Sequence, residues 1–221
     1  MRKLVMLTTG QSPRQDWAAD LEAVLPPGTQ LVQAGVLDGM TIREVEALDF
    51  APGDNVIVTK MQDSNEVRIP EHHARALVIK KLTELENAGF DIIYLACTWD
   101  FKLNPGKALI ICPQKILAGI LPALALDKTL GLCVPDERQI KAASERWGPY
   151  AGRLVLSSCN PYQLDDDARA AAEKFNSEKV DLVLLDCMGF TKEAGDFFRK
   201  ITGKPVLVPR ILVNRILAEL L

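Results

Sequence analysis

Two of the five cysteines in this chain occupy positions where a thiol could do chemistry. Cys187 follows the apolar run Val180–Leu185, which is typical of a buried strand, and the residues Lys192–Lys200 favour a helix. In an open α/β sheet, ligands bind at the carboxyl ends of the strands. The N–H groups and positive dipole end of the helix favour a thiolate there, so Cys187 is predicted to be an acid/base or a nucleophile. The alternative is a small buried hydrophobic side chain.

Cys97 repeats this arrangement in the first half of the chain. Segments Ala74–Thr98 and Ala168–Met188 each contain a helix, an aspartate, a short apolar run and a cysteine at the end of the strand. The echo indicates two similar lobes. If these lobes face each other about a pseudo-two-fold axis, Cys97 and Cys187 approach a shared cleft from opposite sides. The alternative to two similar lobes is that any two βα units resemble each other in their periodicity. The alternative for Cys97 is a packing role.

Polar residues that follow the first strand and Cys97 are candidates for binding a substrate. Thr9, Gln11 and Arg14 come directly after an apolar strand, again at a carboxyl end. The Arg14 guanidinium offers two parallel hydrogen bonds to a carboxylate, and the Thr98 hydroxyl and N–H group could hold the same kind of anion. The alternative is that Thr9 forms a turn and that Arg14 is a solvated surface charge. The loop matches no phosphate-binding motif.

Further candidates surround the second cysteine. Backbone N–H groups after each cysteine, including those of Met188 and Gly189, would stabilise an enolate-like state. Asn160 is a weaker candidate for substrate contact. Cys159, its neighbour on a loop after a strand, is predicted to be structural or incidental. The two remaining cysteines, Cys112 and Cys133, lie within apolar runs and are also predicted to be structural.

No metal site and no cofactor are predicted. His72 and His73 open a long helix, and adjacent helical residues face different directions, so surface histidines are expected rather than a matched pair of ligands. The sequence contains no HExxH or similar constellation. The acidic run Asp165–Asp167 is most simply the N-terminus of a helix, where the dipole favours negative charge.

Strands and helices alternate along the chain, which predicts the α/β class with mostly parallel sheets. The exception is a hairpin around Gln62–Asn65, which is expected at a sheet edge. The 221 residues allow two lobes of about 100 residues each.

Composition and charge indicate which classes of partner and which compartment are expected. The net charge is −3 with Lys and Arg scattered, which does not favour nucleic acid or an anionic membrane. No apolar run approaches the roughly 18 residues that span a bilayer. The chain starts with a strand and no signal-peptide pattern, so a cytoplasmic protein with reduced thiols is expected.

With these residues in view, the chain resembles the AroM family within the aspartate/glutamate/hydantoin racemase superfamily. The resemblance rests on TTGQSPRQD at 8–16, LDCMGFT at 185–191 and PRILVNRILAELL at 209–221. It implies two α/β lobes with the active site between them and a final helix that returns to the first lobe. The expected domains are therefore 1–113 with 205–221, and 114–204.

The resemblance also implies an activity. Superfamily members perform cofactor-free proton chemistry beside a carboxylate or carbonyl, and racemases use two cysteines on opposite faces of the substrate. Related arylmalonate decarboxylases have one essential cysteine, and maleate isomerases use a cysteine as nucleophile. We therefore expect a cofactor-independent racemase or isomerase acting on a small carboxylate, with Cys187 as the principal group and Cys97 as its partner. The alternatives are a decarboxylase of a malonate-like acid and a non-catalytic intracellular metabolite-binding protein. Relatives are often dimers, so a homodimer is also expected.

Overall fold

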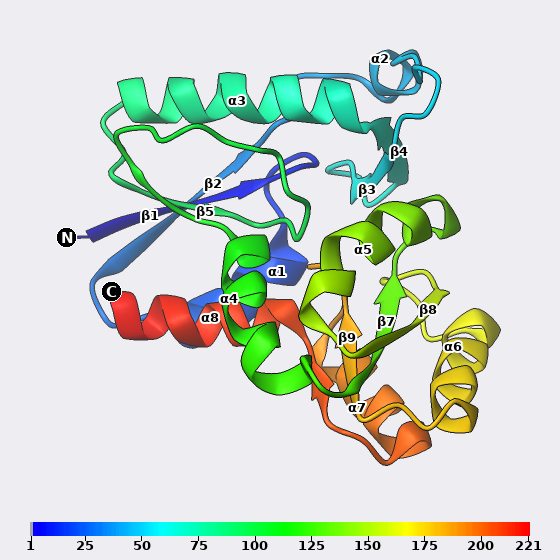
Figure 1. Cartoon of the computed structure of the whole chain (residues 1–221). Coiled ribbons are helices and arrows are strands. Elements are labelled where there is room, and N and C mark those ends of the chain that lie inside the picture. The colour runs from blue at the N-terminus through cyan, green and yellow to red at the C-terminus, as the bar shows by residue number, and fades with distance from the viewer. Residues whose placement is uncertain (1) are drawn as a thin grey trace. The chain divides into compact units, whose positions relative to one another are not determined.

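The computed structural model describes residues 2–221 and divides into two compact units (Figure 1). The first unit comprises Met1–Pro113 and Asn214–Leu221, and the second comprises Gln114–Val213. Each unit is built around its own four-stranded sheet.

The elements that begin in the first unit are β1 (Arg2–Thr8), α1 (Gln15–Glu22), β2 (Thr29–Gly35), α2 (Ile42–Glu46), β3 (Val56–Lys60), β4 (Glu66–Pro70), α3 (Glu71–Asn87), β5 (Ile92–Leu95), β6 (Leu109–Ile111) and α4 (Pro113–Ala125). Those that begin in the second unit are β7 (Thr129–Val134), the 3₁₀ turn η1 (Glu137–Gln139), α5 (Ile140–Trp147), the 3₁₀ turn η2 (Gly148–Tyr150), β8 (Arg153–Ser158), α6 (Asp166–Ser177), β9 (Leu182–Leu185), α7 (Lys192–Thr202), β10 (Val206–Leu207) and α8 (Pro209–Leu220). All of α4 except Pro113 lies in the second unit, and α8 enters the first unit at Asn214.

The two sheets have the same strand order. The first is ordered β2-β1-β5-β6, and the second, followed from its other edge, is ordered β8-β7-β9-β10. Every neighbouring pair in both sheets is parallel. Strands β5 and β9 therefore occupy equivalent places. The prediction of two similar α/β lobes with parallel sheets is confirmed.

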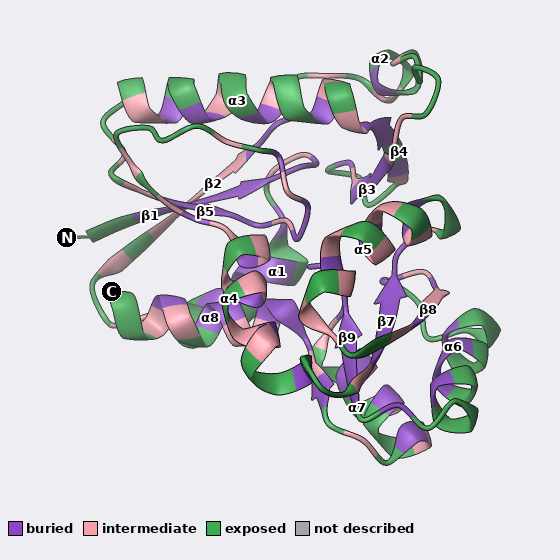
Figure 2. Cartoon of the chain, viewed as in Figure 1, coloured by how far each residue is buried: buried purple, intermediate pink, exposed green. Residues whose placement is uncertain are grey.

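Helices cover both faces of the second sheet. Side chains alternate along its strands: Leu130, Leu132 and Val134 pack with residues of α4 and α5, whereas Cys133 packs with residues of α6 and α7. This alternation is the period of two that a β-strand imposes. The central strands β7 and β9 are accordingly buried on both faces (Figure 2), which explains their nearly continuous apolar sequences.

The first sheet is covered in the same way, with α1 and α3 on opposite faces (Figure 1). The hairpin that the sequence predicts near residue 62 forms between β3 and β4 with antiparallel pairing. Its expected place at the edge of the main sheet is wrong, because β3 and β4 form a separate two-stranded sheet.

Helix termini follow the local sequence. Thr41 caps α2 with its hydroxyl accepting from the Glu44 N–H, while the Glu44 side chain accepts from the Thr41 N–H, and the two residues form a capping box. Asp165 caps α6 in the same way, so the acidic run there serves the helix N-terminus as expected.

Residues 205–213, which the sequence analysis placed in the first lobe, belong to the second unit. The reason is strand pairing: Val206 and Leu207 of β10 pair with Val183 and Leu184 of β9. Only the final segment, Asn214–Leu221, belongs to the first unit.

A glycine is required where β1 ends. A Cβ atom at Gly10 would lie 2.2 Å from the Lys60 carbonyl oxygen and 2.5 Å from the Thr59 hydroxyl oxygen, too close without backbone movement. We expect Gly10→Ala to lower the free energy of unfolding by about 1–3 kcal/mol, the usual cost of overpacking. Gly119→Ala is the control, because nothing lies within 4 Å of a Cβ there and alanine favours the helix by roughly 0.5–1 kcal/mol. Urea unfolding of both variants measures the difference, and equal stabilities would contradict the prediction.

Candidate active site

Cys187 lies in the turn between β9 and α7. Its N–H group donates to the Leu185 carbonyl at 2.8 Å, and its Sγ accepts from the Gly189 N–H at 3.3 Å. The thiol is partly buried. Thr191 then caps α7, with its hydroxyl accepting from the Ala194 N–H. The thiol is therefore positioned by a strand end, a backbone donor and the start of a helix, as the sequence predicts.

Cys97 has the same local geometry after β5. Its N–H group donates to the Leu95 carbonyl at 2.7 Å, and its Sγ accepts from the Trp99 N–H at 3.4 Å. This thiol is also partly buried. Because β5 and β9 hold equivalent places in their sheets, the two units present a cysteine at the same point of the same topology. Hydrogen bonds from N–H groups to sulfur favour the thiolate form.

The loop that carries Asn160 lies against the turn that carries Cys187. A Cβ atom at Gly189 would lie 2.8 Å from the Tyr162 ring and 3.0 Å from Pro161 Cβ. The Asn160 side-chain oxygen accepts from the Tyr162 N–H at 2.9 Å and so fixes this loop. Of the predicted residues in the second unit, the structure thus brings Cys187, Gly189 and the Asn160 loop together. Met188 is buried, with 2% of its surface exposed.

Asp186 is the residue that the sequence analysis missed. Its side chain is fully buried, and its Oδ2 atom accepts from Arg146 Nη2 and from Trp147 Nε1, each at 2.6 Å. Its N–H group donates to the Cys133 carbonyl at 2.8 Å. These contacts fix the backbone directly before Cys187. The acidic residue at the end of an apolar strand was a visible signal, but its partners on α5 were not.

Three cysteines lie near the carboxyl ends of neighbouring strands of the second sheet: Cys133 within β7, Cys159 just after β8 and Cys187 just after β9. The Sγ atoms of Cys133 and Cys159 are 3.3 Å apart, and Cys187 packs against the same cluster. Burial raises the pKa of the Cys133 thiol well above its usual range, and the neighbouring Cys159 and Cys187 thiols add to the increase. Cys133 is accordingly held as a neutral thiol in the core.

This difference in environment predicts the order in which the thiols react. In iodoacetamide at pH 8, we expect Cys97 and Cys187 to be alkylated while Cys133 stays unmodified, because a partly accessible thiolate reacts faster than a fully buried neutral thiol. Peptide mass spectrometry measures each site, and the same reaction in urea, where all sites should be modified, is the control. Labelling of Cys133 at the rate of Cys187 in the folded protein would contradict this order.

Thr9 and Gln11 follow β1 as predicted, and both hydrogen-bond within the protein. Thr9 is buried and donates to the Thr59 hydroxyl at 3.3 Å. The Gln11 amide donates to the carbonyl oxygens of Leu37 and Met40, and its oxygen accepts from the Gln62 N–H. Gln11 thus ties the end of β1 to two other segments, at the edge of a shallow depression that it lines together with Met40, Ile42, Met61, Gln62 and Asp63.

Arg14 is buried rather than a solvated surface charge. Its Nε and Nη2 atoms donate to the two carboxylate oxygens of Asp16 at 2.8 and 2.7 Å, and its guanidinium lies 4.0 Å from the centre of the Trp17 ring. Arg14 therefore makes its bidentate pair with Asp16 of this chain, and its contact with a substrate carboxylate stays a prediction. Thr98, next to Cys97, is 6% exposed.

With its two parallel sheets of equal strand order, the chain has the fold of the racemase superfamily. An allantoin racemase from Klebsiella pneumoniae superposes with a TM-score of 0.64 at 14% identity, covering 100% of this chain and 87% of the racemase. An aspartate racemase from Picrophilus torridus superposes with a TM-score of 0.58 at 15% identity, covering 99% of this chain and 94% of the racemase. An arylmalonate decarboxylase superposes with a TM-score of 0.57 at 14% identity, covering 97% of this chain and 92% of the decarboxylase.

The family is more specific than the fold. The chain belongs to the AroM family, because the model of that family, described as AroM protein, matches residues 4–221. No curated protein sequence matches this chain. Within residues 2–221, no helix has the length and apolar character needed to cross a membrane.

Proposed function

We propose that this protein is a cofactor-independent enzyme that moves a proton at a carbon next to a carboxylate or carbonyl, with Cys187 as the principal acid/base. The observation that carries the proposal is the matched geometry of the two cysteines. Each follows an equivalent strand, donates its N–H group to the residue two before it and accepts at sulfur from the residue two after it. The racemase fold of the chain agrees with this chemistry.

In the proposed reaction, the Cys187 thiolate removes the proton on the carbon α to the carboxylate, and the electron pair of that C–H bond moves into an enolate-like state. Backbone N–H groups of the turn after Cys187 would stabilise the developing negative charge. A thiol then returns a proton to the same carbon, and the enzyme regains its starting charge. If Cys97 returns the proton on the opposite face of the substrate, the configuration at the α-carbon is inverted, which is racemisation.

Deuterium exchange tests the proposal. The protein is incubated in D₂O with aspartate, glutamate, allantoin and related small acids, and loss of the α-hydrogen signal is followed by NMR. Racemisation is followed on single enantiomers by circular dichroism. Exchange that depends on the protein supports the proposal, whereas saturable binding of a carboxylate without any exchange would replace the enzyme with a metabolite-binding protein.

Decarboxylation is the second candidate, because an arylmalonate decarboxylase shares the fold. A thiol would then protonate the carbanion left by loss of carbon dioxide. Release of carbon dioxide from a malonate-like acid, without α-hydrogen exchange in aspartate, glutamate or allantoin, would favour this reaction.

We place the enzyme in the cytoplasm, since its five cysteine thiols suit a reducing compartment.

A further inference from the structure

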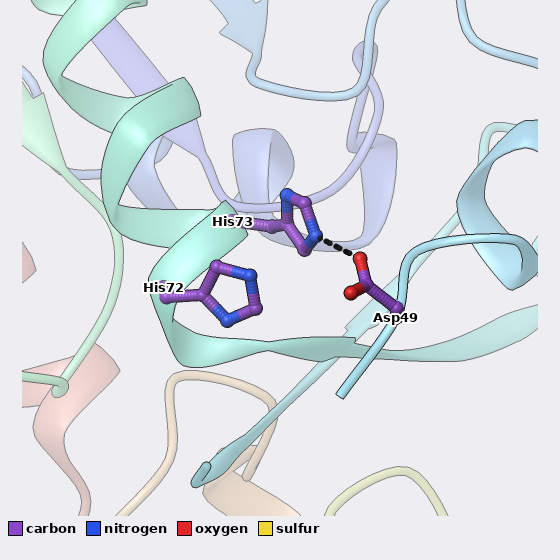
Figure 3. A group of neighbouring side chains, drawn as sticks. All are labelled: Asp49, His72 and His73. Atoms are coloured by element: carbon purple, nitrogen blue, oxygen red, sulfur yellow. Dashed lines mark hydrogen bonds and ion pairs between the residues drawn. The ribbon is translucent and has the colours of Figure 1, made fainter. Parts of the chain in front are cut away.

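Three side chains with metal-binding atoms gather at the start of α3. His72 and His73 lie in its first turn, and Asp49 lies in the segment after α2 (Figure 3). One ligand atom from each of the three residues lies within 4.8 Å of the other two. We propose that this Asp49–His72–His73 cluster binds a divalent transition-metal ion, with Zn²⁺ as the representative.

The expectation that two adjacent histidines point apart is wrong here. The centres of the His72 and His73 rings are 4.0 Å apart, and His73 Nε2 is 2.9 Å from Asp49 Oδ1 (Figure 3). Residues in the first turn have no preceding turn that restricts their side-chain rotamers, so both rings can lean to one side.

A fourth residue holds one of the ligands in place. His72 Nδ1 lies 2.5 Å from Asp54 Oδ2, and that oxygen also accepts from the Ala51 N–H at 2.8 Å. The Asp54 side chain is only 13% exposed. Because a carboxylate oxygen can only accept, Nδ1 donates to Asp54, and Nε2 is left as the His72 atom that can bind a metal ion. A carboxylate that orients a histidine in this way is the usual support of a metal-binding imidazole.

The donor set selects the kind of ion. Two imidazole nitrogens favour zinc, nickel, copper or iron over magnesium and calcium, which prefer oxygen. Zinc bonds of about 2.0–2.2 Å place neighbouring ligand atoms roughly 3.4 Å apart in a tetrahedron. His73 and Asp49 are already at 2.9 Å, so binding needs only small side-chain movements. In the metal-bound state, the proton of His73 moves from Nε2 to Nδ1, and water completes the coordination.

The ion would join α3 to the segment between α2 and β3, two parts of the chain that are separated by the hairpin in sequence.

Titration with ZnCl₂ tests the site, and the chain offers a clear signal because it contains only two histidines. We expect both imidazole Hε1 resonances of the unmodified protein to shift together and saturate at one equivalent of Zn²⁺. Calorimetry should show that His73→Ala and Asp49→Ala each weaken binding at least 10-fold. Asp54→Asn, which keeps the shape but loses the charge, should weaken it about 10–100-fold. Asp127→Ala, at an exposed aspartate of the second unit, is the control and should bind as the unmodified protein does.

Thiols also bind zinc, so the cysteines must be separated from this site. The double variant His72→Ala/His73→Ala removes the site and keeps all five cysteines. If it binds Zn²⁺ with unchanged affinity and stoichiometry, the proposal is overturned. It is also overturned if saturation of the unmodified protein leaves both histidine resonances in place, a result that does not depend on how any variant folds.

Discussion

Cys187→Ser is expected to slow α-hydrogen exchange by about 10²–10⁴-fold in whichever carboxylate the protein turns over. A serine hydroxyl keeps the size of the side chain and can still accept from the Gly189 N–H, but it does not ionise near neutral pH. The change therefore removes the proton carrier while leaving the turn intact. The measurement is the NMR exchange rate at saturating substrate, with far-UV circular dichroism to confirm the fold.

Serine variants of two other cysteines provide the comparisons for this prediction. Cys112, after β6, is also partly buried, and Cys112→Ser should exchange at the rate of the unmodified protein. Cys97→Ser should still exchange the α-hydrogen of one enantiomer and lose the conversion between enantiomers, since one thiol serves one face of the carbon. An unchanged exchange rate in Cys187→Ser would remove that residue from the reaction.

Asp186→Ala is expected to lower the free energy of unfolding by about 3–5 kcal/mol, because it breaks a buried ion pair from one side. The Asp186 side chain is fully buried and accepts from both Arg146 and Trp147, so its loss deprives a guanidinium and an indole N–H of their carboxylate. Urea unfolding of the whole chain, followed by tryptophan fluorescence, measures the change.

A surface ion pair of the same unit provides the matched control. Arg153 Nη1 and Glu178 Oε2 are 3.0 Å apart, but the two side chains are 51% and 46% exposed. Glu178→Ala should therefore cost no more than about 1 kcal/mol. Equal losses in Asp186→Ala and Glu178→Ala would show that burial does not govern the Asp186 interaction.

Most of the fold could be predicted from the sequence, because local signals determine it. Apolar runs predict the strands: the run Val180–Leu185 contains β9, and the residues Lys192–Lys200 that favour a helix lie within α7. The internal echo was also informative: a cysteine after two similar βα segments predicted the equal places of β5 and β9. Such patterns repeat because each parallel strand needs the same crossover and the same buried faces.

Long-range pairings could not be predicted. Arg146 is 40 positions from Asp186, and nothing in either local sequence indicates that they meet. The same holds for Asp49 and His73, which are 24 positions apart. The boundary near residue 205 depends on two residues of β10, a strand too short to have a reliable pattern. In each case the contact follows from tertiary packing.

The membership of α8 in both units affects how the protein is made. The second unit is continuous in sequence, from Gln114 to Val213, whereas the first needs Asn214–Leu221 as well as its long N-terminal segment. Domains generally fold as they emerge from the ribosome. Here all four strands of the first sheet are translated before the second unit, but the part of α8 that belongs to the first unit is translated after it. The nascent chain therefore holds the first sheet without this helical segment until synthesis is nearly finished.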